Sequence, residues 1–352
     1  MIANIRLQQF RSYTDSSFEF DEKTNIIVGP NASGKTNLLE AISVVTRGKS
    51  FRAKDADLIA HNHTWARLDA FVNNKPKTVK LYSDRVTSKE FGVNNKTYKR
   101  LTKDFVYPVV LFEPNDLIML YGSPDSRRAY LDNIIDYRDL THLNTLKLYA
   151  RSIAQRNRLL KQRHITDESL FVWDLRLSQL AEKITSARLV MLEIINQSIP
   201  DVYSKIAGKE QVLELRLKSN CDVKQYGTSM LHKLESNRRL DIERGFTSVG
   251  PHRDDIEIIL NDIIANQSAS RGEFRTILLA LKVIELQTLE NITKEPPILL
   301  LDDVFSELDG KRRHHLTEFI KNYQSFITTT DADIVAKNFT KKTNLIALGV
   351  VN

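Results

Sequence analysis

The chain has 352 residues, and its 51 Lys and Arg against 44 Asp and Glu give a formal net charge of +7 at pH 7. Its composition, 41% hydrophobic and 27% charged, excludes collagen-like and low-complexity classes. No apolar run reaches the roughly 18 residues of a membrane span, and a single cysteine, Cys221, excludes an internal disulfide. We therefore expect a soluble cytoplasmic protein of about two domains, with a charge that suits a polyanionic partner without requiring one.

The first third of the chain is predicted to contain short strands around one helix. Strands are expected over residues 1–10 and 24–28, where apolar residues alternate or run together. A helix is expected over residues 34–47, and further strands over 65–112. Turns are expected in that last region at Asn73–Asn74, Gly92 and Asn94–Asn95.

The middle of the chain is predicted to be helical. Between Pro124 and Pro200 there is neither proline nor glycine, and apolar residues recur at steps of three and four. This pattern indicates a helical hairpin or small lobe, with a break near residues 164–169. The last third returns to mixed structure, with strands expected at 211–217, 256–260, 297–301 and 326–330 and a helix at 272–291.

Residues 29–36 match the phosphate-binding pattern G-x-x-x-x-G-K-[ST] at every fixed position. An apolar strand precedes this loop and a helix follows it, so backbone N–H groups and the helix N-terminus would face an anion. Lys35 would reach the β- and γ-phosphates of ATP, and the Thr36 hydroxyl would bind Mg²⁺. The predicted nucleotide-binding residues of the loop are Gly29, Pro30, Asn31, Ala32, Ser33, Gly34, Lys35 and Thr36.

An apolar strand over residues 298–301 ends in Asp302 and Asp303, the usual arrangement of a Walker B element. Asp302 would sit near the Mg²⁺ together with Thr36, and Asp303 would orient the attacking water as the catalytic residue. Taken alone, the two aspartates also suit a solvated acidic turn. Asp302 follows Thr36 by 266 residues, so a nucleotide-binding core must be assembled from both ends of the chain.

The segment before the long C-terminal helix resembles the ABC signature, which binds the γ-phosphate held by a second subunit. Ser270 and Gly272 would make this contact from a helix N-terminus. The match is imperfect, because Arg271 replaces the first glycine and Glu273 the usual glutamine; a simple helix cap at Ser270 is the alternative. Residues 306–309 stand at the D-loop position, and residues 328–331 hold no switch histidine.

Several segments together resemble the RecF family of SMC-like ABC ATPases, and the resemblance covers essentially the whole chain. The matching segments are LQQFRSY at 7–13, GPNASGKTN at 29–37, FEPNDL at 112–117, GSPDSRR at 122–128, GPHRDD at 250–255 and LDDVFSELD at 301–309. The resemblance implies an ATP-dependent homodimer that binds gapped DNA. It also implies partners of the RecO and RecR kind, and a role in loading RecA during DNA repair, replication and the damage response.

We therefore expect an α/β fold, an ABC-type P-loop ATPase head with an inserted α-helical lobe. The expected parts are residues 1–120 and 206–352 for the head and 121–205 for the lobe. ATP would close two heads, and slow hydrolysis would act as a timer on DNA. The alternatives are another SMC-like DNA-processing ATPase or an ABC transporter subunit, which lacks support because no well-formed L-S-G-G-Q is present. A GTPase would need N-K-x-D, and residues 95–98 lack its aspartate.

Two further segments have alternative interpretations. His252-Arg253-Asp254 mimics the kinase H-R-D, but Ile259 occupies the place of the catalytic-loop asparagine and no D-F-G follows. We favour a structural turn here over a metal cluster. Residues 147–163 are basic with no acidic residue, so this helix either lies along DNA phosphates or is a solvated face. Its candidate DNA contacts are Arg156, Arg158 and Lys161.

Overall fold

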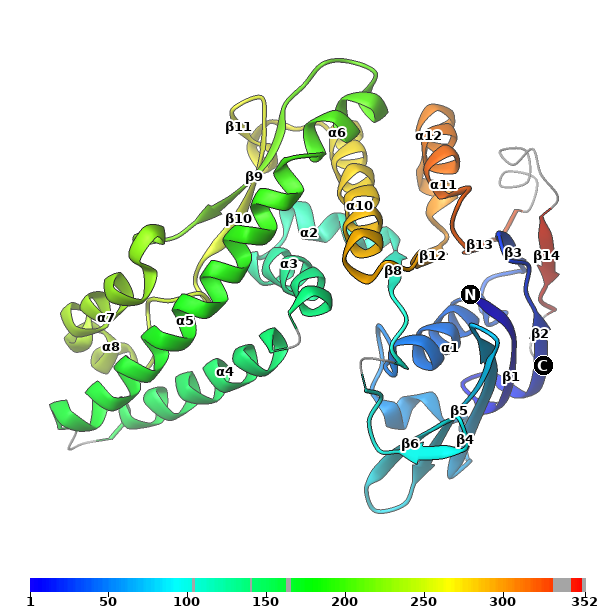
Figure 1. The fold of residues 1–352 in the computed structure, drawn as a ribbon, viewed down its shortest axis with the longest axis horizontal. Coiled ribbons are helices and arrows are strands. Elements are labelled where there is room, and N and C mark those ends of the chain that lie inside the picture. Colours follow the sequence, from blue (N-terminus) through cyan, green and yellow to red (C-terminus); the bar gives the residue numbers. More distant parts are fainter. Residues whose placement is uncertain (103–104, 140, 163–165, 332–342, 350–352) are drawn as a thin grey trace. The chain divides into compact units, whose positions relative to one another are not determined.

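The computed structural model describes residues 1–102, 105–139, 141–162, 166–331 and 343–349. The chain divides into two compact units, one formed by residues 1–114 and 289–352 and the other by residues 115–288. Both ends of the chain therefore belong to the first unit (Figure 1). Among the described residues, no helix combines the length and the apolar character needed to cross a membrane.

The first unit contains two sheets. One is parallel and five-stranded, in the order β14-β3-β13-β12-β8, and the other is antiparallel and six-stranded, in the order β2-β1-β4-β5-β6-β7. The elements before the second unit are β1 (Ile2–Phe10), β2 (Tyr13–Glu19), β3 (Thr24–Val28), α1 (Lys35–Arg47), η1 (Asp55–Leu58), β4 (Trp65–Val72), β5 (Lys75–Ser83), β6 (Thr87–Val93), β7 (Lys96–Tyr98) and β8 (Val109–Phe112). Those after it are β12 (Ile298–Asp302), α11 (Val304–Glu307), α12 (Gly310–Ile320), β13 (Ser325–Thr329) and β14 (Asn344–Ala347).

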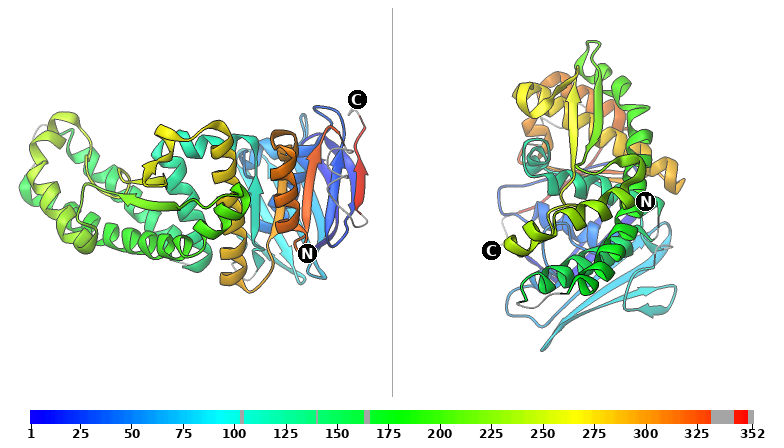
Figure 2. Two further views of the ribbon diagram at one scale, coloured as in Figure 1. Left: turned by 90° about the horizontal axis from the view of Figure 1, so that it is seen from above. Right: turned by 90° about the vertical axis from the view of Figure 1, so that its left-hand side faces the viewer.

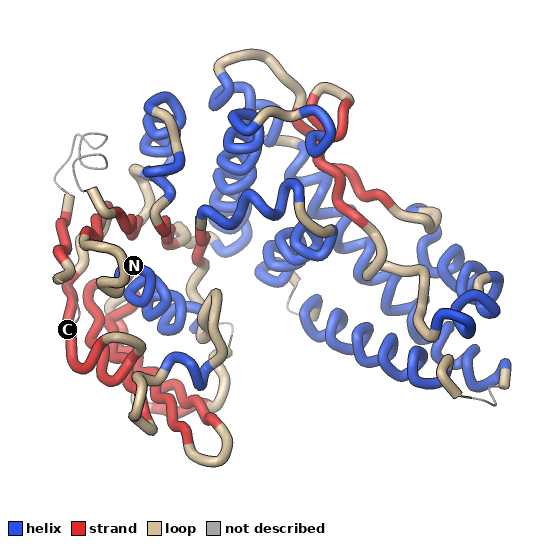
Figure 3. The backbone as a smooth tube through the Cα atoms, turned by 180° about the vertical axis from the view of Figure 1, so that it is seen from behind, coloured by secondary structure: helices blue, strands red, loops and turns tan. Residues whose placement is uncertain are grey.

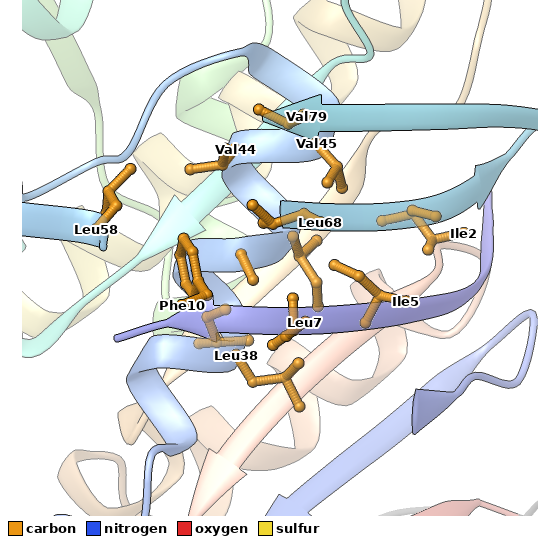
Figure 4. Close-up of a cluster of buried hydrophobic side chains, with 14 of the residues drawn as sticks. Ile2, Ile5, Leu7, Phe10, Leu38, Val44, Val45, Leu58, Leu68 and Val79 are labelled. Atoms are coloured by element: carbon orange, nitrogen blue, oxygen red, sulfur yellow. The ribbon is translucent and has the colours of Figure 1, made fainter. Parts of the chain in front are cut away.

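Helix α1 packs against strands of both sheets and forms the centre of this unit's core. Figure 4 shows its Leu38, Val44 and Val45 among apolar side chains from β1, β4 and β5. Leu38 and Val45 are fully buried, as are Leu7 and Leu68 on the facing strands. Burial of these side chains fixes the start of α1, and with it the loop that precedes the helix.

The strands and the helix expected over the first 112 residues are present. Of the three turns expected in this region, two are found and one is not. Asn73–Asn74 and Asn94–Asn95 have positive φ and close the β4–β5 and β6–β7 hairpins, as expected. The turn expected at Gly92 was wrong, because Gly92 lies inside β6 and pairs with Thr78 and Thr97. A glycine can mark a turn, or it can lie inside a strand where another backbone approaches closely. The sequence alone does not distinguish these two roles.

The second unit is mostly helical (Figure 3), and its one described sheet is antiparallel, in the order β11-β10-β9. Its elements are η3 (Pro114–Leu117), α2 (Ile118–Tyr121), α3 (Pro124–Arg138), α4 (His142–Leu159), α5 (Asp167–Asn196), α6 (Ile199–Ala207), β9 (Leu213–Lys218), η4 (Val223–Gln225), α7 (Tyr226–Ser236), α8 (Arg238–Arg244), β10 (Asp255–Leu260), β11 (Ile263–Ile264) and α9 (Ala265–Ser268). Helix α10 (Arg271–Thr293) begins in this unit and ends in the first.

The second unit extends beyond the helical lobe expected at residues 121–205. Helix α4 lies along α5 (Figure 2), and β9 and α7 pack against the same long helix. The side chain of Asn196, at the end of α5, donates to the Leu215 carbonyl at 2.8 Å and accepts from the Leu215 N–H at 2.9 Å. Residues 206–288, expected with the head, group instead with the helices, because β9 and α7 pack against α5 and β10 pairs with β9 and packs against α3.

Candidate nucleotide-binding site

The candidate site lies at one edge of the parallel sheet. Strand β13 lies between β3 and β12 in this sheet, and all three run in the same direction. Their carboxyl ends therefore meet at one edge, where ligands bind in open parallel sheets. This topology brings the loop of residues 29–34 together with Asp302 at the end of β12 and Asp303 after it, although 266 residues separate Thr36 from Asp302.

Two glycines shape the loop. Gly34 has φ +95°, a conformation that L side chains rarely adopt, and a Cβ there would lie 2.9 Å from the Tyr13 hydroxyl. That hydroxyl donates to the Gly34 carbonyl at 3.0 Å. At Gly29 a Cβ would lie 2.6 Å from Ser33 Oγ and 2.7 Å from the Leu348 carbonyl oxygen. The loop can therefore adopt this shape only with glycine at both positions.

Lys35 is the first residue of α1, and its ammonium group lies over the loop. Nζ donates to the carbonyl oxygens of Gly29 at 2.7 Å and Pro30 at 2.8 Å. Burial lowers the pKa of Lys35, while the nearby carboxylates of Asp303 and Asp302 oppose that shift. The loop thus carries a positive charge beside backbone N–H groups at a helix N-terminus, a combination that binds phosphate.

Thr36 and Asp302 are in direct contact. The Thr36 hydroxyl lies 3.0 Å from Oδ1 and 2.9 Å from Oδ2 of Asp302. A hydroxyl and a carboxylate are oxygen ligands of the kind that Mg²⁺ prefers. The structure therefore brings together the two residues predicted as metal ligands.

Asp303 has an unusual backbone conformation, with φ 53° and ψ 27° at the start of α11. Such a conformation is uncommon for a residue other than glycine and costs of order 1 kcal/mol or more. Its Oδ1 is buried without a hydrogen-bond partner among the described residues, and so is Ser33 Oγ in the loop. These two buried polar atoms beside the phosphate loop fit a site that takes a polar ligand.

Thr328, on β13, was not among the predicted site residues, yet it contacts both aspartates. Its hydroxyl donates to Asp302 Oδ1 at 2.7 Å and accepts from the Asp303 N–H at 2.9 Å. In the sequence, Thr328 stands out only as part of residues 328–331, which hold no switch histidine. The local pattern of β13, in which three of five residues carry hydroxyls, does not indicate that the Thr328 hydroxyl meets Asp302.

A second missed group lies next to the loop. Glu40, on α1, is fully buried and accepts from Arg11 at 2.7 and 3.0 Å and from Arg52 at 3.4 Å. Burial opposes its ionisation, but hydrogen bonds from Arg11 and Ser50 outweigh that effect and lower the pKa of Glu40. Asn37 accepts from Arg52 at 2.6 Å, so the network extends toward the loop. Arg11 and Arg52 lie outside α1, so residue spacing along the chain did not predict this network around Glu40.

The signature segment lies in the second unit. Ser270 precedes α10 and forms a reciprocal capping box with Glu273: the Glu273 N–H donates to Ser270 Oγ at 3.2 Å, and Glu273 Oε2 accepts from the Ser270 N–H at 3.0 Å. These hydrogen bonds lower the pKa of Glu273. Glutamate at this position, a departure from the usual glutamine, therefore serves to cap α10. Gly272 is part of the first turn of the same helix.

Of the three candidate DNA-contact residues, Arg156 is not on the surface. It is fully buried, and its guanidinium donates to Asp174 and Asp241, each at 2.6 Å. The expectation that Arg156 contacts DNA was wrong, because two carboxylates from α5 and α8 surround it. Arg158 and Lys161 are exposed. Arg163 lies outside the described residues.

His252 lies in a turn whose groups are held by surrounding helices. Its Nδ1 is 2.8 Å from the Tyr149 hydroxyl and its Nε2 is 3.3 Å from the Thr247 carbonyl. Because a carbonyl can only accept, Nε2 carries the proton and Nδ1 accepts from Tyr149. Burial lowers the pKa of His252 to about 4. No group of three potential metal-binding side chains occurs in the part of the chain that the structure describes.

Comparison with known proteins identifies the family. The family model of the RecF/RecN/SMC N-terminal domain matches residues 1–347. The DNA replication and repair protein RecF of Clostridium perfringens is 34% identical over 334 residues, which cover 94% of this chain and 92% of that one. This chain belongs to the RecF family. RecF of Clostridium beijerinckii is 36% identical over 336 residues, which cover 93% of this chain and 91% of the relative.

Solved structures of RecF and of SMC heads share this fold. One described as the recombination mediator protein RecF-ATP in the RecFOR pathway is 31% identical, with a TM-score of 0.83 over 94% of this chain and 92% of that one. An Smc head bound to the C-winged helix domain of ScpA is 18% identical, with a TM-score of 0.55 over 98% and 93% of the two chains. The expected fold class, an ABC-type ATPase head with an inserted helical lobe, is confirmed.

Proposed function

We propose that this protein is an ATP-dependent DNA-binding recombination mediator with weak ATPase activity, acting in DNA repair and replication. The observation that carries the proposal is the contact between Thr36 and Asp302 beside a glycine-shaped loop that holds Lys35. Membership of the RecF family, and the likeness to a structure described as RecF-ATP, support ATP as the nucleotide.

Each site residue has a defined part in this proposal. Loop residues 29–34 bind phosphate oxygens through backbone N–H groups, and Lys35 adds a positive charge. Thr36 and Asp302 hold Mg²⁺, which when bound neutralises phosphate charge. Asp303 orients the attacking water, and its buried Oδ1 is an acceptor available for this task.

The proposed partners follow from the family and from the second unit. Ser270 and Gly272, at the N-terminus of α10, would face the γ-phosphate held by a second copy of the chain. We propose gapped DNA as the polyanionic partner, with exposed Arg158 and Lys161 as candidate phosphate contacts. RecO- and RecR-like partners, and RecA through them, are proposed on the family alone, as is a cytoplasmic location.

The test separates nucleotide binding from hydrolysis. Asp303→Asn removes a carboxylate but keeps Asp302 for the metal, so it should bind ATP like the parent and hydrolyse it more slowly, by about a hundredfold or more. Binding is measured with a fluorescent ATP analogue, and hydrolysis by phosphate release with and without gapped DNA. Asp222→Asn, at an exposed turn of the second unit, is the matched control.

Two outcomes would contradict the proposal. A parent protein that binds no ATP excludes the assigned site altogether. Hydrolysis by Asp303→Asn at the parental rate excludes the role of Asp303 in orienting water.

A further inference from the structure

We infer that Thr328 is a positioning residue for ATP hydrolysis, which sets the Asp302 carboxylate and the Asp303 main chain in one fixed arrangement. This inference rests on the proposed function and adds to it a residue outside the phosphate loop and the aspartate pair. The evidence is its location in the sheet, its two hydrogen bonds and the conformation of Asp303.

The sheet places Thr328 between the two halves of the site. Strand β13 lies between β3, which leads into the phosphate loop, and β12, which ends at Asp302. Thr328 is directly paired with Asp302 on one side and with Ile27 on the other. It is fully buried, so water does not compete for its hydroxyl. A side chain at this position can therefore act on Asp302 without touching nucleotide.

The hydroxyl of Thr328 uses its hydrogen-bonding capacity on the two aspartates. Its single proton goes to Asp302 Oδ1 at 2.7 Å, since a carboxylate only accepts, and a second contact to the Leu301 carbonyl is much longer at 3.4 Å. A lone pair accepts the Asp303 N–H at 2.9 Å. One side-chain oxygen thus connects the metal-binding carboxylate to the main chain of the catalytic residue.

The backbone of Asp303 explains why such a connection is needed. Its left-handed conformation is unfavourable for aspartate and persists only where surrounding contacts hold it. The N–H bond to Thr328 is one such contact, and it accompanies a side chain whose Oδ1 is buried without a partner among the described residues. Loss of the Thr328 hydroxyl would remove this contact from the main chain of Asp303 and leave its partly buried N–H without that acceptor.

The Asp302 carboxylate is oriented from two sides. Thr36 donates to it from α1 and Thr328 from β13, so its oxygens lie between the two hydroxyls. Without the Thr328 hydroxyl, the Asp302 carboxylate keeps, among the described residues, its hydrogen bond from Thr36, and Thr36 would itself bind Mg²⁺ in the proposed mechanism. We therefore expect loss of the Thr328 hydroxyl to change the Mg²⁺ requirement and the turnover of ATP. Phosphate binding by the loop should stay unchanged.

The experiment compares Thr328→Val, which keeps the shape without the hydroxyl, with Thr328→Ser, which restores the hydroxyl. Thr328→Val should lower kcat by about ten- to a hundredfold, the loss expected for a hydrogen bond to a charged group. It should also raise the Mg²⁺ concentration for half-maximal activity, with ATP affinity in EDTA unchanged. Thr328→Ser should recover most of the turnover. Thr328→Ala gives the same comparison if the valine variant does not fold.

The matched control is Thr317→Val, which removes another buried hydroxyl of the same unit; among the described residues this hydroxyl bonds to the Arg313 carbonyl of its own helix. It should leave kcat and the Mg²⁺ requirement unchanged. The inference is overturned if Thr328→Val turns over ATP at the parental rate, or if Thr328→Ser is as slow as Thr328→Val. Because Asp303→Asn is assayed alongside, a slow Asp303→Asn with a fast Thr328→Val rejects this inference alone, whereas a parent without ATPase activity rejects the proposed function.

Discussion

Lys35 owes its position to the glycines around it. The loop carbonyls of Gly29 and Pro30 turn inward far enough to accept from Nζ, a conformation that a Cβ at residue 29 would obstruct. Lys35 is 9% exposed as a residue, and burial lowers the pKa of its ammonium group. A cation whose hydrogen bonds, among the described residues, go to neutral carbonyl oxygens can exchange them for stronger charge-assisted bonds to an anion.

The first prediction concerns this charge. Lys35→Ala should weaken ATP binding by about ten- to a hundredfold, because a hydrogen bond to a charged group is lost. Equilibrium titration with a fluorescent ATP analogue measures the change. Lys183→Ala, at an exposed position of α5, serves as the matched control. Equal affinity of Lys35→Ala and parent would mean that the loop does not bind phosphate.

His252 is a residue whose protonation state differs between the folded and unfolded chain. Its pKa is about 4 in the folded protein against an ordinary value of 6.5. Between these values the unfolded state binds a proton that the folded state does not. The second unit should therefore lose stability as the pH falls from 6.5 to 4, by up to about 3 kcal/mol.

The second prediction is that His252→Gln removes this part of the pH dependence. Urea unfolding of the variant should depend less on pH between 6.5 and 4 than unfolding of the parent. His232→Gln, at an exposed position of α7, should follow the parent. Trp65 and Trp173 are the two tryptophans and lie in different units, so a Trp65→Phe background reports on the second unit through Trp173. If the free energies of unfolding of the parent and of His252→Gln change equally with pH between 6.5 and 4, His252 does not have the lowered pKa assigned to it.

At the scale of elements, buried ion pairs join the helices of the second unit. Arg156 on α4 donates to Asp174 on α5 and to Asp241 on α8, and all three are fully buried. The Thr247 hydroxyl accepts from the same guanidinium at 3.1 Å. Removing one member of such a group leaves the remaining buried charges uncompensated. The resulting loss of stability is larger than the net stability that the complete group contributes.

The third prediction follows from that asymmetry. Arg156→Ala should lower the free energy of unfolding of the second unit by about 3–5 kcal/mol. Arg158→Ala, two residues along the same helix and exposed, should change it by less than about 0.5 kcal/mol. Urea unfolding followed by Trp173 fluorescence in the Trp65→Phe background measures both. Equal losses of the free energy of unfolding in the two variants would mean that Arg156 is a surface residue without buried ion pairs.

At the scale of the whole molecule, nucleotide binding and the signature segment belong to different units of one chain. The phosphate loop lies in the first unit, and Ser270 with its capping box precedes α10 in the second. The proposed dimer would use the loop of one copy and the signature of the other. ATP would then be held by both copies, and its hydrolysis would release them.

The fourth prediction tests this arrangement. Ser270→Arg should bind ATP as the parent does but should remain monomeric with ATP, because the larger side chain fills the space assigned to the γ-phosphate of the partner. Light scattering measures the mass with and without ATP. Ser236→Arg adds the same charge at an exposed position of α7 and should dimerise normally. Dimerisation of Ser270→Arg would rule out the signature assignment.

Local patterns in the sequence predicted the phosphate loop and many of the elements around it, but not α7, α8, α12 or β14. Residues 29–36 carry their own conformational requirements, since the glycines, the lysine and the following helix are neighbours in the chain. The strand ending at Asp302 was also predicted, because a run of apolar residues ending in acids needs no distant information. Periodicity likewise predicted α4 and α5, which bury one face each.

The tertiary structure decided everything that depends on which elements become neighbours. Thr328 meets Asp302 because β13 is placed between β3 and β12, an order that no local pattern contains. Arg156 looked like one of several basic residues on a helix, and its partners come from 18 and 85 residues away. The grouping of residues 206–288 with the helices was decided by the packing of β9 and α7 against α5 and of β10 against α3. Spacing along the chain determines local conformation, whereas burial and ion pairing depend on contacts that form only when distant segments pack together.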